Sequence, residues 1–448
     1  MTIRGESVER RQHRAGVAYA GPVIRCSRVN VFRGMRAGRI GERASRGERR
    51  MRGAMLLMTL ALAVGASTEV HASELTAAFE AACLRTPEIP ALIARRAEAD
   101  ASARAADALL PGGPWVTVMH RTDALTHDRG TREYEAEFGI PIWLRGERGA
   151  SLAAALTEGE RLEAEIGAKR LEVAKRVREA YWMVAEAREK VAVADRRRST
   201  AAILARILRE QVGAGQAELM ETKLADADLR DAEVSLAGLR SELNQTRIGF
   251  GVLTGFEAPV GFGERGTDAA TPANHPRIVL RRAATEKALA DEQLTWTVDR
   301  ERPELSAFAN NNTDTSAEPN VTSLGVRFKI PFSYDAVNEP KRAAAAAEVI
   351  AAQEELALAE REVGGDVAQA RAKLDGARQQ LTGIEARRAD LAAVLKLTEE
   401  AQRSGQTTFN DVIRARLQLY EADLARASAR VAVERSRSDV TQALGLEP

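Results

Sequence analysis

The feature that most constrains the fold of this chain is an internal repeat. Gly215-Gln216 recurs as Gly405-Gln406, an offset of 190 residues. Other matched pairs keep that offset or one of 189, and these include Pro87 with Pro276, Phe138 with Phe328, Pro141 with Pro331, Leu229 with Leu419, and Gly255 with Gly445. Self-similarity at a fixed period indicates repeated supersecondary units. We therefore predict a first repeat at 73–257, a linker at 258–274, and a second repeat at 275–448.

Each half contains one very long stretch without proline and with little glycine, rich in Ala, Glu, Arg and Leu. At 1.5 Å per residue, about 65 residues form a rod of roughly 100 Å. Globular helices are far shorter, so these stretches are predicted to be rods or coiled coils. The expected helices span 87–109, 146–211 and 217–254 in the first half, and 276–298, 341–403 and 408–444 in the second.

Two short alternating segments stand between the helices of each half, within hairpins expected at 114–143 and 303–332. Alternation with period two places one set of side chains on each face of a sheet. The apolar set fits lipid, and the other set would line a water-filled lumen with Glu135, Glu137, Arg327 and Lys329. Four strands are too few to close a barrel around an open lumen, so the chain must oligomerise.

The first 72 residues are expected to lie outside the fold. Residues 51–72 have the charges, apolar run and small residues of a signal peptide. Residues 1–50 are interpreted as a start codon assigned too early, or alternatively as a disordered basic arm. Residues 1–72 hold 14 Arg and five Glu, a net charge of +9. Because the whole chain has a net charge of +1, the residues after 72 have a net charge of −8. That sign gives no general attraction to nucleic acid.

No catalytic constellation is apparent, so we predict no enzyme activity, no cofactor and no metal site. Residues 261–266 match G-x-G-x-x-G, but a long helix precedes them and a Thr/Pro-rich segment follows, which favours a linker over a dinucleotide site. His120 and His127 could bind a metal, although solvated residues on a hairpin are the simpler interpretation. Cys83 is the one cysteine after the predicted signal peptide, so no disulfide within the mature chain is expected.

The order of these motifs resembles the TolC family of outer-membrane efflux proteins over about residues 75–445. Thr86-Pro87 and His275-Pro276 open the two halves. A Gly, an acidic residue six positions later and a helix ending in Gly occur twice, with Gly215 and Glu221 in the first half and Gly405 and Asp411 in the second. No single motif is specific, but their duplicated order is. The segment 338–342 is most similar to channels of heavy-metal efflux systems, of the cobalt-zinc-cadmium type.

The resemblance implies a mainly α fold with a small membrane β-barrel. Long α-helical hairpins would form a periplasmic tunnel, and a homotrimer with four strands per chain would close the barrel in the outer-membrane lipid. It implies the channel component of a tripartite pump, which contacts a periplasmic adaptor directly and an inner-membrane pump indirectly. The adaptor would dock at the helix turns, at Gly213, Gly215, Gln216, Ser404, Gly405 and Gln406.

Several alternatives stay open from the sequence. Glu221 and Asp411 would form an acidic ring at the tunnel tip, or they are first-turn carboxylates favoured by the helix dipole. Charges on the water-facing strand side would tune selectivity, or they are merely solvated. A periplasmic adaptor or a structural coiled-coil protein of the envelope is the alternative function. The exported substrate, the cognate pump, the gating trigger and the true start codon do not follow from the sequence.

Overall fold

The structure is a computed structural model that describes residues 74–127, 129–214, 218–261, 264, 274–315, 317 and 319–448. The chain divides into two units, Met1–Thr59 and Leu60–Pro448, and all described residues belong to the second unit. The predicted N-terminal extension at 1–50 and the signal peptide at 51–72 therefore lie outside the described residues.

Helices occupy the stretches expected from composition. The two long ones are α3, Glu147–Gly213, with 67 residues, and α6, Asp335–Arg403, with 69 residues. The shorter helices are α2 at Glu88–Ala106, α4 at Leu219–Thr254, α5 at Pro276–Thr297 and α7 at Phe409–Ala443. Residues 74–85 are also helical, which the sequence analysis did not predict. None of the described helices is both long and apolar enough to cross a membrane.

The largest boundary difference is at the start of α6, which was expected at residue 341 after Pro340. The helix begins at Asp335, and Pro340 lies inside it. A proline there removes one backbone hydrogen bond, but the first turn is secured from outside the helix. Asn338, which is buried, donates to the backbone carbonyl of Asp299 and, at 3.3 Å, to the Ser333 hydroxyl.

The four strands form one antiparallel sheet in the order β1-β2-β3-β4. Their bounds are Trp115–Thr122, Arg132–Pro141, Glu304–Thr313 and Val321–Lys329. The sequence predicted the last strand to continue to residue 332. It ends at Lys329, which pairs with Glu304, the first residue of β3. Pro331 has no N–H to donate, so the ladder has no reason to extend further.

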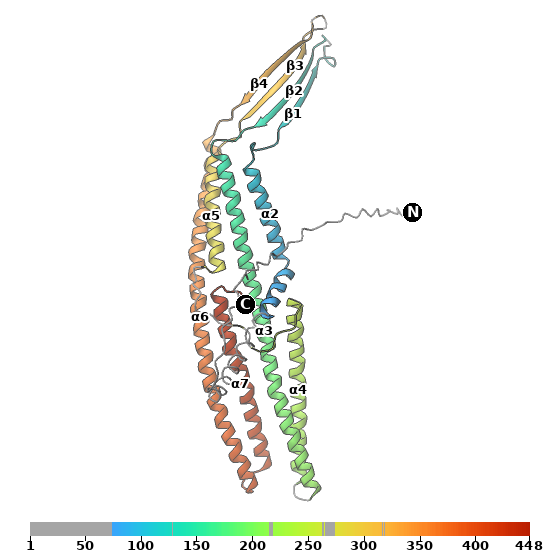
Figure 1. Cartoon of the computed structure of the whole chain (residues 1–448), viewed down its shortest axis with the longest axis vertical. Coiled ribbons are helices and arrows are strands. Elements are labelled where there is room, and N and C mark those ends of the chain that lie inside the picture. The colour runs from blue at the N-terminus through green and yellow to red at the C-terminus, as the bar shows by residue number, and fades with distance from the viewer. Residues whose placement is uncertain are drawn as a thin grey trace, which may run out of the picture. The chain divides into compact units, whose positions relative to one another are not determined.

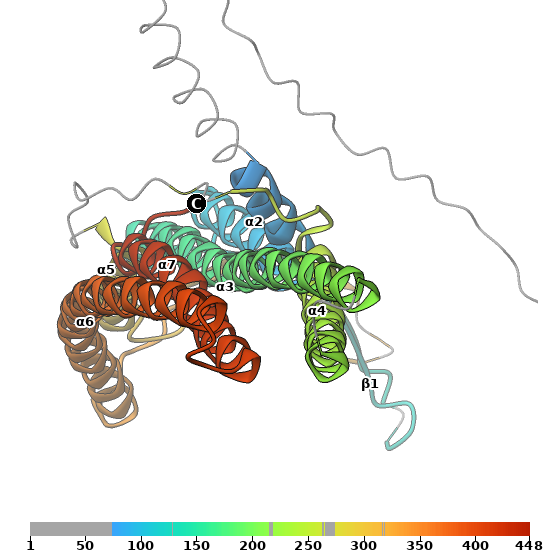
Figure 2. The same cartoon turned by 90° about the horizontal axis from the view of Figure 1, so that it is seen from below.

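The long helices connect two sets of shorter ones. Near the sheet, α2 and α5 pack on α3, and α5 also packs on α6 (Figure 1). Toward the opposite ends, α4 packs on α3 and α7 on α6, as both Figure 1 and Figure 2 show. The order helix, two strands, long helix, shorter helix thus occurs twice along the described chain.

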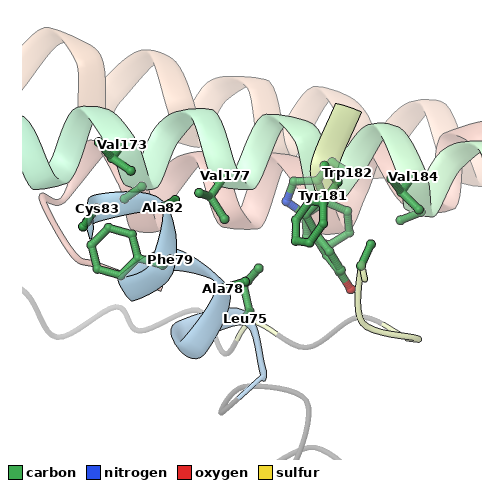
Figure 3. Packing of buried hydrophobic residues seen from close by; sticks show 14 of the residues in the cluster. Leu75, Ala78, Phe79, Ala82, Cys83, Val173, Val177, Tyr181, Trp182 and Val184 are labelled. Carbon is green, nitrogen blue, oxygen red and sulfur yellow. The ribbon is translucent and has the colours of Figure 1, made fainter. Parts of the chain in front are cut away.

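The largest hydrophobic cluster lies midway along α3, where the helical residues 74–85 pack against it (Figure 3). Phe79 and Ala78 meet Val177 and Tyr181, and all four are at most 1% exposed. Apolar residues at positions 75, 78, 79 and 82 give this short helix one buried face. The same region brings residues 76 and 448 together, because the Thr76 hydroxyl donates to the backbone oxygen of Pro448 at 2.9 Å.

Candidate functional site

The strand register gives the sheet one apolar face. Val116 of β1 stands beside Phe138, Ala307 and Val326, and the next row holds Val118 and its partners. These side chains are not covered: Val118 is 76% and Val326 is 72% exposed in the single chain. Large exposed apolar faces mark surfaces that meet a partner or lipid.

The opposite face carries the four charged residues expected there. Arg327 contacts Glu137 at 2.5 Å and Glu135 at 3.4 Å, which joins β4 to β2 across β3. Glu137 is 6% exposed and also accepts from the Ser306 hydroxyl at 2.5 Å. Lys329 does not join this cluster. It pairs with Glu304 at 3.3 Å and Glu301 at 3.4 Å, two residues that the sequence analysis did not single out.

Two aromatic rings cover glycines on this charged face. Trp115 pairs with Gly139, and Phe308 pairs with Gly325, and in each case a Cβ on the glycine would collide with the ring. The Arg327 guanidinium lies 5.0 Å from the Phe308 ring centroid. Both glycines occur in alternating strand segments, which was the available signal, because a glycine inside a strand often marks a close approach.

A buried carboxylate joins the sheet to the helices. Glu147, at the start of α3, has no solvent exposure. It accepts from the Leu144 backbone N–H at 2.9 Å and pairs with Arg302 at 2.7 Å. Gly146 precedes it with φ +84°, a conformation that favours glycine. Since Arg302 leads into β3, this contact ties the two strand pairs together at their helical end.

The turn from α6 to α7 is strongly determined by its sequence. Gly405 has φ +75°, its N–H bonds to Gln402, and the Gln406 N–H bonds to Ala401 at 2.9 Å. These are the two hydrogen bonds of a Schellman motif. Ser404 is the C-cap residue. The predicted turn at Ser404, Gly405 and Gln406 is therefore present.

Helix α7 then begins with a capping box between Thr408 and Asp411. The Thr408 hydroxyl, followed by that of Thr407, holds the pKa of Asp411 below its ordinary value by donating hydrogen bonds to the carboxylate. Asp411 thus caps the helix. The cap accounts for an acidic residue at the third position of the helix.

The turn from α3 to α4 is described only in part. Helix α3 continues two residues past its expected end at 211, so Gly213 is its last residue and Ala214 is its C-cap residue. Gly215 and Gln216 lie outside the described residues. Glu221 is in the first turn of α4, whose N-cap residue Glu218 makes no side-chain capping bond.

The start of α7 contacts the last part of α3 and the first part of α4. Phe409, at the start of α7, packs with Ala205 and Leu208 of α3 and with Ala225 of α4. Farther along, Arg197 of α3 pairs with Asp228 of α4 at 3.0 Å and stacks on the ring of Tyr420. No local sequence pattern marks Arg197, Asp228 or Tyr420 as partners, because contacts between separate hairpins leave none.

The described residues include no group of three or more His, Cys, Asp or Glu able to hold a metal ion. His120 stacks on Tyr134 with ring centroids 4.4 Å apart, and His127 lies in the following loop. Within the G-x-G-x-x-G match, residues 262, 263, 265 and 266 lie outside the described residues. Glu264 is described, and it forms a buried ion pair with Arg178 at 2.5 Å.

Comparison with known proteins shows which family and which relative parts of this chain are similar to. Residues 78–255 match the family model described as outer membrane efflux protein. The cobalt-zinc-cadmium resistance protein CzcC of Cupriavidus metallidurans is 27% identical over 214 residues, 46% of this chain and 51% of that protein. The chain therefore matches that curated relative over about half of the relative's length.

Solved structures share the fold. The outer membrane protein VceC from Vibrio cholerae gives a TM-score of 0.66 at 16% identity, covering 83% of this chain and 96% of that chain. The CmeC outer membrane channel of Campylobacter jejuni gives 0.62 at 13% identity, covering 84% and 85%. CusC gives 0.65 at 15% identity, covering 84% and 92%.

Residues 78–255 thus match the outer membrane efflux protein family, and the fold is that of solved outer-membrane channels, so the family resemblance predicted from the motifs is confirmed.

Proposed function

We propose that this chain is the outer-membrane channel component of a tripartite export pump. The observation that carries the proposal is the sheet with one exposed apolar face and one charged face, attached to two long helical hairpins. A sheet of this kind suits lipid on one side and water on the other. It is not expected of a periplasmic adaptor or of a coiled-coil protein without strands, the two alternatives considered above.

The channel would be a homotrimer. Four strands cannot enclose an aqueous lumen, whereas three copies would supply twelve. The recurring element order also supports the sequence repeat at 73–257 and 275–448. Helix α6 exposes Ile350, Leu358 and Leu397 in the single chain, so these side chains have apolar surface available for a neighbouring copy.

The charged strand face would line the lumen. Glu135 and Glu137 balanced by Arg327, with Lys329 beside Glu304, give a mixed rather than a strongly acidic surface. Mixed charges would pass solutes of either sign with modest selectivity. This geometry makes Arg327 the residue that offsets the charges of Glu135 and Glu137.

The two helix turns, at 213–216 and 404–406, would form the docking surface for a periplasmic adaptor, through which the inner-membrane pump is reached. Two observations support this role: the start of α7 packs on the last part of α3 and the first part of α4, and these helix ends lie far from the sheet (Figure 1). The relative named for cobalt-zinc-cadmium resistance makes divalent metal ions the cargo to test first.

An export assay tests the proposal in a strain that depends on this protein for metal tolerance. The wild-type protein should fractionate with the outer membrane, run in detergent at the mass of three chains, and restore tolerance. Gly405→Trp should keep location and mass but lose tolerance, because the positive φ and the end-on surface are both disturbed. Gly383→Trp, at an open helix position, is the matched control. Recovery of the wild type as a soluble periplasmic monomer would overturn the proposal.

A further inference from the structure

The end of α7 is seated directly on the start of α5. Gly445 follows α7 with φ +79°, and its N–H and that of Leu446 close a second Schellman motif. A Cβ on Gly445 would lie 2.7 Å from Pro276 Cδ and 2.8 Å from His275 Cδ2. The backbone at the end of α7 therefore touches the imidazole ring, and only glycine leaves room for that contact.

His275 is the N-cap residue of α5 and is 4% exposed. Its Nδ1 accepts a hydrogen bond from the Arg277 backbone N–H at 3.1 Å. Accepting through Nδ1 requires a neutral ring with the proton on Nε2. Burial, and secondarily the Arg277 charge, holds the pKa of His275 below its ordinary value of 6.5.

Protonation would remove what the ring does at this position. An imidazolium carries a proton on both nitrogens. Its Nδ1–H would face the Arg277 backbone N–H, and the hydrogen bond that Nδ1 now accepts would be lost. The added positive charge would also sit at the positive end of the α5 dipole. Both effects push the ring away from its cap position, and the ring is the surface on which Gly445 rests.

Charged groups from every neighbouring helix line the same cleft, whose volume is about 1180 Å³. Asp366 of α6 opposes the pKa decrease, but it is engaged with Arg277 at 3.0 Å. The cleft is lined in addition by Glu88 and Arg95 of α2, Glu165, Lys169, Glu172, Lys175, Arg178 and Glu179 of α3, Lys373 of α6, and Arg435 and Asp439 of α7. Because these groups include both acids and bases, their effects on the pKa of His275 oppose one another. Burial and the Arg277 charge therefore set the direction of the shift.

The corresponding joint in the other half lacks such a group. Gly255 ends α4 with φ +79°, and a Cβ there would collide with the Arg85 guanidinium. The residue before the proline is Thr86, whose hydroxyl donates to the Ala82 carbonyl at 2.8 Å. No imidazole stands at the position of Thr86. The two joints therefore share a geometry but not a titratable side chain.

We propose that His275 makes the α5–α7 joint a pH-sensitive latch, closed when the ring is neutral and released when it is protonated. Helix α7 runs from this joint to the turn at 404–406, so release would loosen the α7 side of the structure and leave the α4 side fixed. The latch is a property of the folded chain and does not depend on the export role.

The pH window follows from the direction of the shift. A base whose pKa is lower in the folded state is stabilised while neutral, so its contribution is complete above about pH 6.5. The contribution is lost as the pH falls from there through the lowered pKa of the folded protein. Acidification therefore opens the latch, and alkaline conditions leave it closed.

Hydrogen exchange on the full-length protein in detergent tests the latch, read at about pH 7.5 and about pH 5.5, on either side of the ordinary histidine pKa. After correction for intrinsic rates, wild-type amides at 441–446 should lose protection severalfold at the lower pH. Amides near Gly255 should not change. His275→Asn keeps a side-chain acceptor for the cap and cannot titrate, so it should stay protected at both values.

Two further variants keep the result interpretable. His275→Thr copies Thr86 and should behave like the Asn variant. His275→Lys places a permanent charge at the cap and should be unprotected at both pH values. An equal loss of protection in wild type and His275→Asn would overturn the proposal, as would full protection of the Lys variant at both values.

Discussion

The cluster around Phe79 and the apolar face around Phe138 use the same kinds of side chain in opposite ways. Phe79 is fully buried among Val177, Tyr181 and Ala78, whereas Phe138 is 52% exposed in a face without a covering element in the single chain. The neighbouring apolar residues behave in the same way: those around Phe79 are also buried, and those beside Phe138, such as Val116 and Val326, are also exposed. The difference indicates that the two regions suit different surroundings. The Phe79 cluster is a core closed off from water, and the Phe138 face suits contact with lipid or with a partner.

Truncation of each phenylalanine to alanine tests this difference and should give the largest effect. Phe79→Ala should lower the free energy of unfolding by about 3–5 kcal/mol, because it leaves a cavity in a packed core. Phe138→Ala should have a much smaller effect, since no cavity forms on an open face. Denaturant unfolding followed by near-ultraviolet circular dichroism measures both. Equal losses would mean that the strand face is covered in the same manner as the core.

A charge on the strand face should have the next largest effect. Val118→Arg places a guanidinium on the apolar face and should cost about 2–4 kcal/mol if that face is near mid-bilayer. Thr117→Arg is the matched control, because Thr117 pairs with Glu137 on the charged face. Folding yield in lipid vesicles should separate the two variants. A Val118→Arg protein that folds as well as the control would argue against a lipid-facing surface.

The smallest effect concerns an arrangement that occurs beside the Phe79 cluster and again on the charged face of the sheet, opposite Phe138. In each place an arginine stacks on a phenylalanine ring and pairs with two glutamates. Arg170 stacks on Phe79 and pairs with Glu80 and Glu447. Arg327 stacks on Phe308 and pairs with Glu135 and Glu137. Arg170→Lys loses the bidentate geometry but keeps the charge. Because Arg170 is partly exposed, the cost should be under about 1 kcal/mol.

The Arg170 contact also gives a pH dependence with a definite sign. Its hydrogen bonds hold the pKa of Glu80 below the ordinary value of 4.5. A carboxylate with a lowered pKa stabilises the fold above pH 4.5, and that stabilisation is lost as the pH falls below this value. Unfolding of wild type and Arg170→Lys at neutral and acidic pH should therefore converge at acidic pH. A difference that persists there would contradict this origin.

The sequence predicted those parts of the fold that rest on local pattern. The two long helices follow from stretches without helix breakers, and the first strand pair follows from alternation within the hairpin expected at 114–143. The turn at Ser404–Gln406 follows from a glycine with helix-forming residues on both sides. Helix 74–85 was missed because a short apolar spacing beside a predicted cleavage site is ambiguous.

The contacts that connect distant segments could not be predicted. Nothing near Glu147 indicates that Arg302 will neutralise it, since 155 residues separate the two. Burial of Glu137 depends on Ser306 and Arg327 from two other strands. The end of α3 lies two residues beyond the expected 211, because helix propensity alone does not fix where a helix ends.

The contact between residues 76 and 448 has a consequence for how the chain can be rearranged. Arg170 reinforces it by holding Glu80 and Glu447 together, so the beginning and the end of the described fold are adjacent in space. A circular permutant that joins these two points with a short linker and opens the chain within 265–273 would place the second half first in the gene. Such a protein would retain every contact described above, and the order in which the ribosome makes the two halves would become an experimental variable.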